Sequence, residues 1–260
     1  MIIVTFDMNQ YLIFLLASCR TAGVIFFNPI FGRNSVPTIM KVGLSLAIAL
    51  YAVFDLSVNQ IQVINYSTIE FIGAMLQGFV IGIVIGFIMS MFLTVFQLGG
   101  ELIDMQMGLS MASMYDPATK ASISVTGNLL TAMYVLIFFI SNAHLALFTV
   151  LIKSFQVVPV GFGGVSDKVG VYFIELMYYI FLYAVQLAIP IIVTEIIAEF
   201  AVGILMRLVP NINVFVINIQ IKVFIGLIVI FTLIPTLANF MTQMNLLMME
   251  KINQVLTFFM

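Results

Sequence analysis

Long apolar stretches separated by short polar ones dominate the pattern of this 260-residue chain. A lipid bilayer offers the backbone no hydrogen-bond partners, so apolar runs of ~20 residues cross it as helices that satisfy their own backbone groups. The pattern therefore predicts an all-α, polytopic membrane protein of about six or seven hydrophobic helices. The number depends on whether the two tracts around Glu195 form one broken helix or two. The tracts cover residues 11–31, 42–58, 71–98, 129–152, 171–193, 196–209 and 223–240.

Composition supports the same class. Hydrophobic residues make up 63% of the chain and charged residues only 8%, whereas a soluble domain carries roughly 25% charged residues. The apolar runs are too long for the ~10-residue strands of a membrane β-barrel. No repeat, low-complexity segment or flexible linker divides the chain, so we expect a single domain over residues 1–260. The small net charge of −2 favours a lipid membrane, and no nucleic acid, as partner.

A stripe of small residues recurs at a four-residue step as Gly78, Gly82 and Gly86, and Ser90 and Thr94 continue it. Positions four apart lie on one face of a helix, and small residues let another backbone approach closely. The stripe therefore predicts helix packing or subunit contact at the three glycines. Packing inside the chain and contact with a different subunit both fit the spacing.

A second distinctive segment, residues 99–127, is less hydrophobic than the tracts around it and rich in methionine. On a helix, Met107, Met111 and Met114 would share one face. A weakly polar segment at membrane depth is tolerated only where protein buries it or where it lines a water-filled cavity. Because methionine is unbranched and adaptable, such a surface can seal against varied shapes. Two interpretations stay open: a plain packing helix, or an adaptable seal.

Ionisable residues inside the apolar tracts form the third feature. Glu195, Glu199 and Arg207 lie at multiples of four residues and predict a buried polar ridge, and Arg20 and Asp104 also lie in or beside apolar tracts. A charge at the bilayer centre costs on the order of 3 kcal/mol or more, so such groups face a bundle interior, a cavity or one another. Glu199 and Arg207 are ~12 Å apart along a helix, too far to pair directly. Salt bridges to other helices and a proton relay are both compatible with the pattern.

The sequence motifs of enzymes are missing. His144 is the only histidine, no Cys or carboxylate stands near it at ligand spacing, and no HExxH, Walker or GxSxG pattern occurs. We therefore expect neither an enzyme nor a metal or cofactor site.

Several longer motifs resemble one family. Residues 28–32 read NPIFG, a helix-ending pattern, residues 100–117 read GELIDMQMGLSMASMYDP, and residues 203–215 read GILMRLVPNINVF. Together with residues 142–144 and 154–161, they occur in the order and at the spacing of the FliR family of flagellar export-gate proteins. Ala143 and Asn211 depart from that pattern, which has Gly and Gln there.

The resemblance implies a non-enzymatic core subunit of the type III protein export channel. Such a subunit stands beside several copies each of FliP and FliQ, with FlhB and FlhA completing the gate. It would lie in the bacterial inner (plasma) membrane at the flagellar basal body, with unfolded flagellar proteins as cargo. The helices would pack as hairpins in a helical hetero-oligomeric channel assembly. Subunits of virulence secretion systems share the pattern and remain an alternative.

The resemblance also implies a function for the methionine-rich segment, because the matching part of the family plugs the channel. The pore plug would consist of Met105, Gln106, Met107, Gly108, Ser110, Met111, Met114, Tyr115, Asp116 and Pro117. A different class of function is a small-solute secondary transporter, in which Glu195, Glu199 and Asp104 carry protons or a coupling ion. The lack of inverted repeats argues against a transporter, and the lack of catalytic motifs argues against a membrane enzyme.

Overall fold

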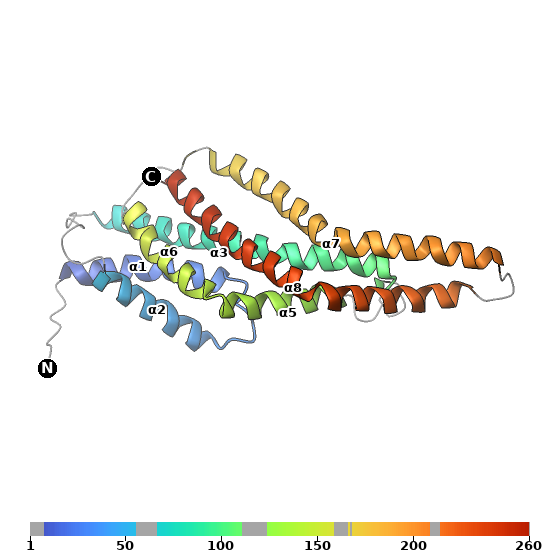
Figure 1. Ribbon diagram of the computed structural model, residues 1–260. Coiled ribbons are helices and arrows are strands. Elements are labelled where there is room, and N and C mark those ends of the chain that lie inside the picture. The colour runs from blue at the N-terminus through green and yellow to red at the C-terminus, as the bar shows by residue number, and fades with distance from the viewer. Residues whose placement is uncertain are drawn as a thin grey trace, which may run out of the picture. The chain divides into compact units, whose positions relative to one another are not determined.

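The computed structural model describes residues 8–55, 67–110, 124–158, 166, 168–208 and 214–259. Within these residues the secondary structure is entirely helical (Figure 1). The α-helices are α1 (Met8–Phe27), α2 (Thr38–Asp55), α3 (Thr68–Met107), α5 (Val125–Ile140), α6 (Ala143–Val157), α7 (Lys168–Leu208) and α8 (Val214–Leu256). The all-α class expected from the apolar tracts is confirmed.

Four of the described helices, α1, α3, α7 and α8, are long and apolar enough to cross a membrane. The number rises to five if α5 and α6, which meet at a bend of 69°, form one broken span. The polytopic character predicted from the sequence is therefore confirmed. Helices α3, α7 and α8 contain 40, 41 and 43 residues. At 1.5 Å per residue each is ~60 Å long, about twice the thickness of a hydrocarbon core.

Three apolar tracts form helices in a way that the sequence left open or did not predict. The tracts on either side of Glu195 join into one helix, α7, which runs through Pro190. The tract at residues 129–152 is instead divided, because Asn142 adopts a left-handed conformation with φ 56° between α5 and α6. Asparagine tolerates this conformation better than most residues. Together these differences leave seven α-helices among the described residues.

The described chain forms two compact units. The first contains residues up to Met91, residues 142–174 and the chain from Asn245 onward, and the second contains residues 92–141 and 175–244. Helices α3, α7 and α8 contribute to both units. The single domain expected over residues 1–260 stays a prediction.

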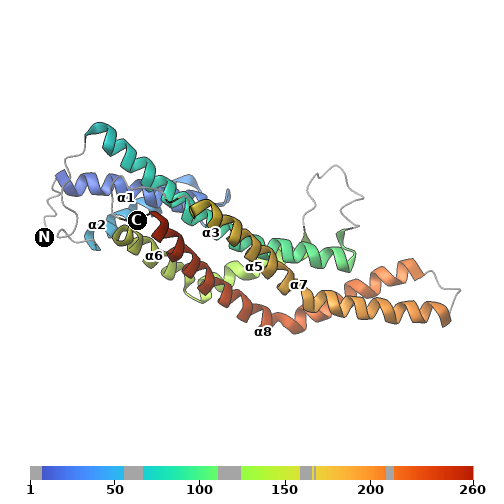
Figure 2. The same cartoon turned by 90° about the horizontal axis from the view of Figure 1, so that it is seen from above.

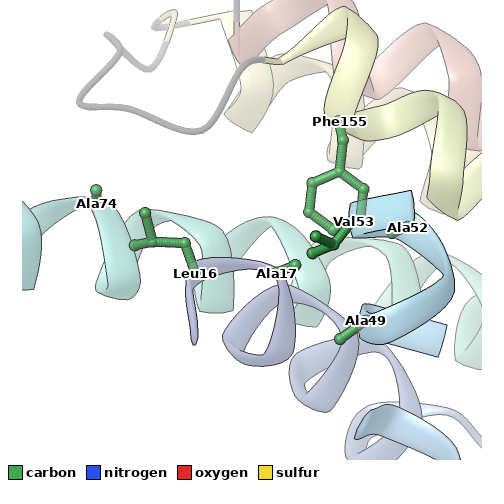
Figure 3. Packing of buried hydrophobic residues seen from close by; sticks show 7 residues of the cluster. All are labelled: Leu16, Ala17, Ala49, Ala52, Val53, Ala74 and Phe155. Carbon is green, nitrogen blue, oxygen red and sulfur yellow. The ribbon is translucent and has the colours of Figure 1, made fainter. Parts of the chain in front are cut away.

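The core of the first unit is built where α1, α2, α3 and α6 meet. Figure 3 shows the ring of Phe155 reaching from α6 toward Val53 of α2 and Ala17 of α1. Small side chains on the facing helices leave room for this ring and allow the backbones to approach. The buried cluster consists of Leu16, Ala17, Ala49, Ala52, Val53, Ala74 and Phe155.

The turn after α1 shows why residues 28–32 end a helix. The side-chain oxygen of Asn28 accepts hydrogen bonds from the N–H groups of Ile30 and Phe31, at 2.7 and 3.1 Å. The N–H of Gly32 donates to the carbonyl oxygen of Asn28 at 2.8 Å. A Cβ at Gly32 would lie 2.5 Å from the carbonyl oxygens of Phe26 and Asn28. Only glycine fits this tight turn, which confirms the helix-ending signal.

The second unit packs the end of α3 against α5, α7 and α8. Phe96 of α3 stacks on Tyr134 of α5 with ring centroids 4.4 Å apart, and its edge meets Phe240 of α8 at 6.5 Å. Figures 1 and 2 both show the later part of α7 and the first part of α8 running side by side. These two helices form a hairpin within the unit.

Candidate functional site

The structure describes the first half of the candidate plug. Met105 and Met107 belong to the last turn of α3, and Gly108 ends the helix with a φ of 78°. A left-handed glycine is the usual residue at such a helix end because a Cβ would be strained there. Five of the candidate plug residues, Met111, Met114, Tyr115, Asp116 and Pro117, lie outside the described residues.

The two methionines at the end of α3 have opposite environments. Met105 is 65% exposed, whereas Met107 is fully buried. The thioether of Met107 fills a notch over Gly226 of α8, because a Cβ built on Gly226 would lie 2.7 Å from its Sδ atom. One methionine is thus anchored to a neighbouring helix and the other is presented at the surface. Gln106, Gly108 and Ser110 are half-buried.

A buried carboxylate joins the end of α3 to the start of α5. Asp104 is 4% exposed, and the Ser124 hydroxyl donates to its Oδ2 atom at 2.7 Å. The N–H of Thr126 donates to the same oxygen at 3.2 Å. The Ser124 hydroxyl also accepts from the N–H of Gly127 at 2.8 Å and so caps α5. These bonds satisfy donors that the first turn of a helix leaves free, and the negative charge suits its positive end.

Beside this carboxylate, the backbones of α3 and α5 touch. A Cβ on Gly100 would collide with the Cα and N atoms of Gly127. Gly100 therefore cannot gain a side chain without moving a helix, and a Cβ on Gly127 would lie 2.7 Å from the capping hydroxyl of Ser124 and 3.1 Å from the carbonyl oxygen of Gln97. The end of α3 and the start of α5 are thus held together by a polar contact and a steric one.

The glycine stripe packs against α1 of the same chain. A Cβ on Gly82 would meet the carbonyl oxygen of Arg20 and lie 2.9 Å from the Cα of Gly23, and one on Gly86 would lie 2.9 Å from the backbone of Phe27. Gly78 is less tightly placed, since its Cβ would lie 3.6 Å from the nearest backbone oxygen. The stripe thus makes a helix-packing contact inside the first unit.

The polar ridge is buried at only one of its three positions. Glu195 is fully buried, and neither of its carboxylate oxygens has a hydrogen-bond partner among the described residues. Glu199 and Arg207 are exposed in this chain, so burial of the ridge at these two positions stays a prediction. Glu199 pairs with Lys222 of α8 at 3.1 Å. The sequence predicted a partner outside the helix for Glu199 but did not identify Lys222.

Arg20 has a role that its place in an apolar tract did not reveal. It is 3% exposed, and its Nη1 atom donates to the carbonyl oxygens of Ser154 and Val158 at 2.9 and 3.0 Å. The guanidinium lies over the ring of Phe155, 4.4 Å from its centroid. A cation is favoured at the carboxyl end of a helix, so Arg20 fixes the end of α6 to α1. A separation of 134 residues hides this contact from any local pattern.

The last sequence features to place are the histidine and possible metal ligands. His144 lies half-buried near the start of α6. In the part of the chain that the structure describes, no three His, Cys, Asp or Glu side chains are grouped so that they could hold a metal ion.

Known proteins resemble the chain over most of its length. It matches the model of the family described as bacterial export proteins, family 1, over residues 11–248. It is 29% identical to the flagellar biosynthetic protein FliR of Escherichia coli (strain K12) over 221 residues, and these residues cover 85% of this chain and 84% of that protein. Against FliR of Bacillus subtilis (strain 168) the identity is 29% over 226 residues, or 84% of each chain.

A protein with a different name is equally similar. The Yop proteins translocation protein T of Yersinia pestis is 29% identical over 219 residues, which cover 83% of this chain and 82% of that protein. The family match includes the candidate plug, the glycine stripe and all three residues of the polar ridge.

Proposed function

Since this chain belongs to the family of bacterial export proteins, family 1, we propose that it is a core subunit of the flagellar type III protein export channel. It helps to form and plug the pore through which unfolded flagellar proteins cross the inner membrane. The observation that carries the proposal is the similarity to FliR proteins of two bacteria over more than four fifths of the chain. The subunit acts by position and packing and is not an enzyme.

Its place is the inner membrane at the flagellar basal body, in a complex with FliP-like and FliQ-like subunits and with FlhA-like and FlhB-like export proteins. The apolar surface of α7 supports such a complex. Met177 and Ile204, 53% and 66% exposed, lie ~40 Å apart along the helix. A hydrocarbon core of ~30 Å covers both only if the helix tilts strongly or bends at Pro190. Otherwise, other subunits would cover the remainder.

The plug is proposed at the segment that begins in the last turn of α3, at Met105. Met105 is exposed at its start, and a flexible thioether can seal against a partner or against passing chains and later yield. Met107, packed over Gly226, provides the fixed end of this segment.

Copurification tests the assembly directly. The tagged chain is extracted from native membranes in mild detergent, and the mass and composition of the purified material are determined. We expect a large, defined complex that contains FliP-like and FliQ-like subunits. A stable monomer or homodimer would contradict the proposal and would point to the transporter alternative, which solute uptake by the purified chain would then test.

An equivalent subunit of a virulence secretion system is the second candidate. It is favoured by the similarity to the Yersinia pestis translocation protein, which equals the similarity to FliR of Escherichia coli in percentage identity. Deletion of the gene separates the two. Loss of flagellar filaments supports the flagellar channel, whereas intact filaments with lost secretion of other proteins support the second candidate.

A further inference from the structure

The contact between the end of α3 and the start of α5 contains more hydrogen bonds than the capping of α5 requires. Ser124 alone supplies an ordinary helix cap, because its hydroxyl accepts from the N–H of Gly127. Asp104 adds hydrogen bonds from another helix, to the Ser124 hydroxyl and to the N–H of Thr126. A buried carboxylate is costly unless it is well paired, so this placement favours a specific registration of the two helices.

The glycine contact fixes the same registration sterically. Gly100 lies one helical turn before Asp104 on α3, and its position leaves no room for a Cβ against Gly127 of α5. Two contacts four residues apart on one helix restrain both its distance from α5 and its rotation. A slip of α3 by one residue would bring the side chain of Glu101 toward the backbone of Gly127.

The restrained turn is the one that carries the methionines. Met107 lies three residues beyond Asp104 and is held over Gly226, and Met105 lies between these anchors with its side chain exposed. A change in the rotation of this last turn would therefore move Met105 first.

We propose that Asp104 is a positioning residue of the channel seal. With Ser124, Thr126, Gly100 and Gly127 it forms a clasp between α3 and α5 that holds Met105 in its sealing position, while Met107 stays anchored over Gly226. The inference rests on the proposed function, because it assigns to the clasp the placement of residues that close the pore. The clasp keeps its contacts while the pore is closed, and its loss loosens the seal without removing any sealing side chain.

The test compares variants in the assembled complex. Asp104→Ala removes the hydrogen bonds that the carboxylate accepts from Ser124 and Thr126, and Ser124→Ala removes the first of these together with the helix cap. Ser124→Thr keeps a hydroxyl, and Glu101→Ala removes an exposed carboxylate one turn earlier on the same helix. Three quantities are measured for each: the composition of the complex, its ion conductance in membranes without export substrate, and the hydrogen–deuterium exchange rate of the N–H of Thr126.

We expect the Asp104→Ala complex to assemble, to exchange the N–H of Thr126 about tenfold faster, and to leak ions. Ser124→Ala should leak as well, whereas Ser124→Thr and Glu101→Ala should match the unaltered complex. Faster exchange in Asp104→Ala with unchanged conductance would overturn the proposal, because the clasp would then only stabilise the fold.

Two further outcomes are also decisive. If Asp104→Ala fails to assemble, Asp104→Asn and Ser124→Ala are measured in its place, and normal conductance in both overturns the inference. A variant with a shortened segment between α3 and α5 serves as the control for the plug itself. If that variant does not leak, the proposed plug fails. If it leaks and the clasp variants do not, only the clasp fails.

Discussion

Arg20 is the clearest case of a single residue that joins distant parts of the chain. Its guanidinium supplies donors to two carbonyl oxygens at the end of α6 and lies over an aromatic ring of the same helix. The carbonyl of Ser154 also accepts from the N–H of Val158 at 2.9 Å, so removal of the guanidinium would take away one of its two donors and the donor to the carbonyl of Val158. Desolvating an unpaired backbone group costs ~1–3 kcal/mol.

Arg20→Met should therefore destabilise the first unit by ~1–3 kcal/mol, on the order of one buried carbonyl left without its donor. The measurement is thermal unfolding of the purified complex, where we expect a clearly lower midpoint. Arg33→Met, at an exposed position of the turn after α1, is the matched control and should change stability by no more than ~0.5 kcal/mol. Equal midpoints for the two variants would show that Arg20 contributes no more than a surface charge.

At the residue scale, the sequence identified positions better than partners. Arg20, Asp104 and Glu195 were recognisable because ionisable side chains are rare in apolar tracts. Their contacts were not, since Asp104 meets Thr126 across 22 residues and Arg20 meets Ser154 across 134. Such contacts follow from how helices are arranged, and no local periodicity records that arrangement.

Among the elements, the packing of α3 on α1 rests on the glycine stripe and offers a matched pair of variants. Gly82→Ala should force α1 and α3 apart, because the new Cβ meets the backbone of α1, and overpacking of this kind costs ~1–3 kcal/mol. Gly78→Ala places its Cβ at an ordinary 3.6 Å from the nearest atom, and alanine favours a helix over glycine by ~1 kcal/mol. We expect a lower thermal midpoint for Gly82→Ala and an equal or higher one for Gly78→Ala. Indistinguishable midpoints would mean that α1 moves freely aside.

The hairpin of α7 and α8 contains an ion pair whose two members should not be equivalent. Lys222 is only 14% exposed and also attracts the buried Glu195, whereas Glu199 is 53% exposed. Glu199→Gln removes a partly solvated partner, and exposed pairs contribute ~0–1 kcal/mol. Lys222→Met removes the cation from both carboxylates, so we expect it to destabilise the complex more than Glu199→Gln does. The reverse order in thermal unfolding would show that Glu195 does not depend on Lys222.

The sequence predicted some helices better than others. The apolar tracts located α1, α2 and α3, because length and apolar composition are local properties. They could not show whether α7 is one helix or two, because an internal proline removes one backbone hydrogen bond but the surrounding apolar turns can maintain the helix. The division between α5 and α6 depends on the conformation of Asn142, and asparagine is compatible with both outcomes.

For the whole molecule, the lengths of the helices constrain the assembly. A helix of ~60 Å that is apolar along its length has more exposed apolar surface than a bilayer of ~30 Å can cover. Met177 and Ile204 of α7 are both exposed and lie ~40 Å apart along the helix, with Pro190 between them. Either the helix departs far from the membrane normal, through tilt or through a bend at Pro190, or protein covers one of its ends.

Cysteine labelling separates these two arrangements. The native Cys19, the only cysteine of the chain, is first replaced by Ser, and Met177→Cys and Ile204→Cys are then introduced one at a time. In the assembled complex we expect at least one of the two to be shielded from both a lipid-soluble quencher and a water-soluble maleimide, because another subunit covers it. In the chain produced without its partners, the same position should become reactive. If the lipid-soluble quencher reaches both positions in native membranes, α7 lies within the hydrocarbon core along this whole length, and its apolar surface no longer supports an assembly with other subunits.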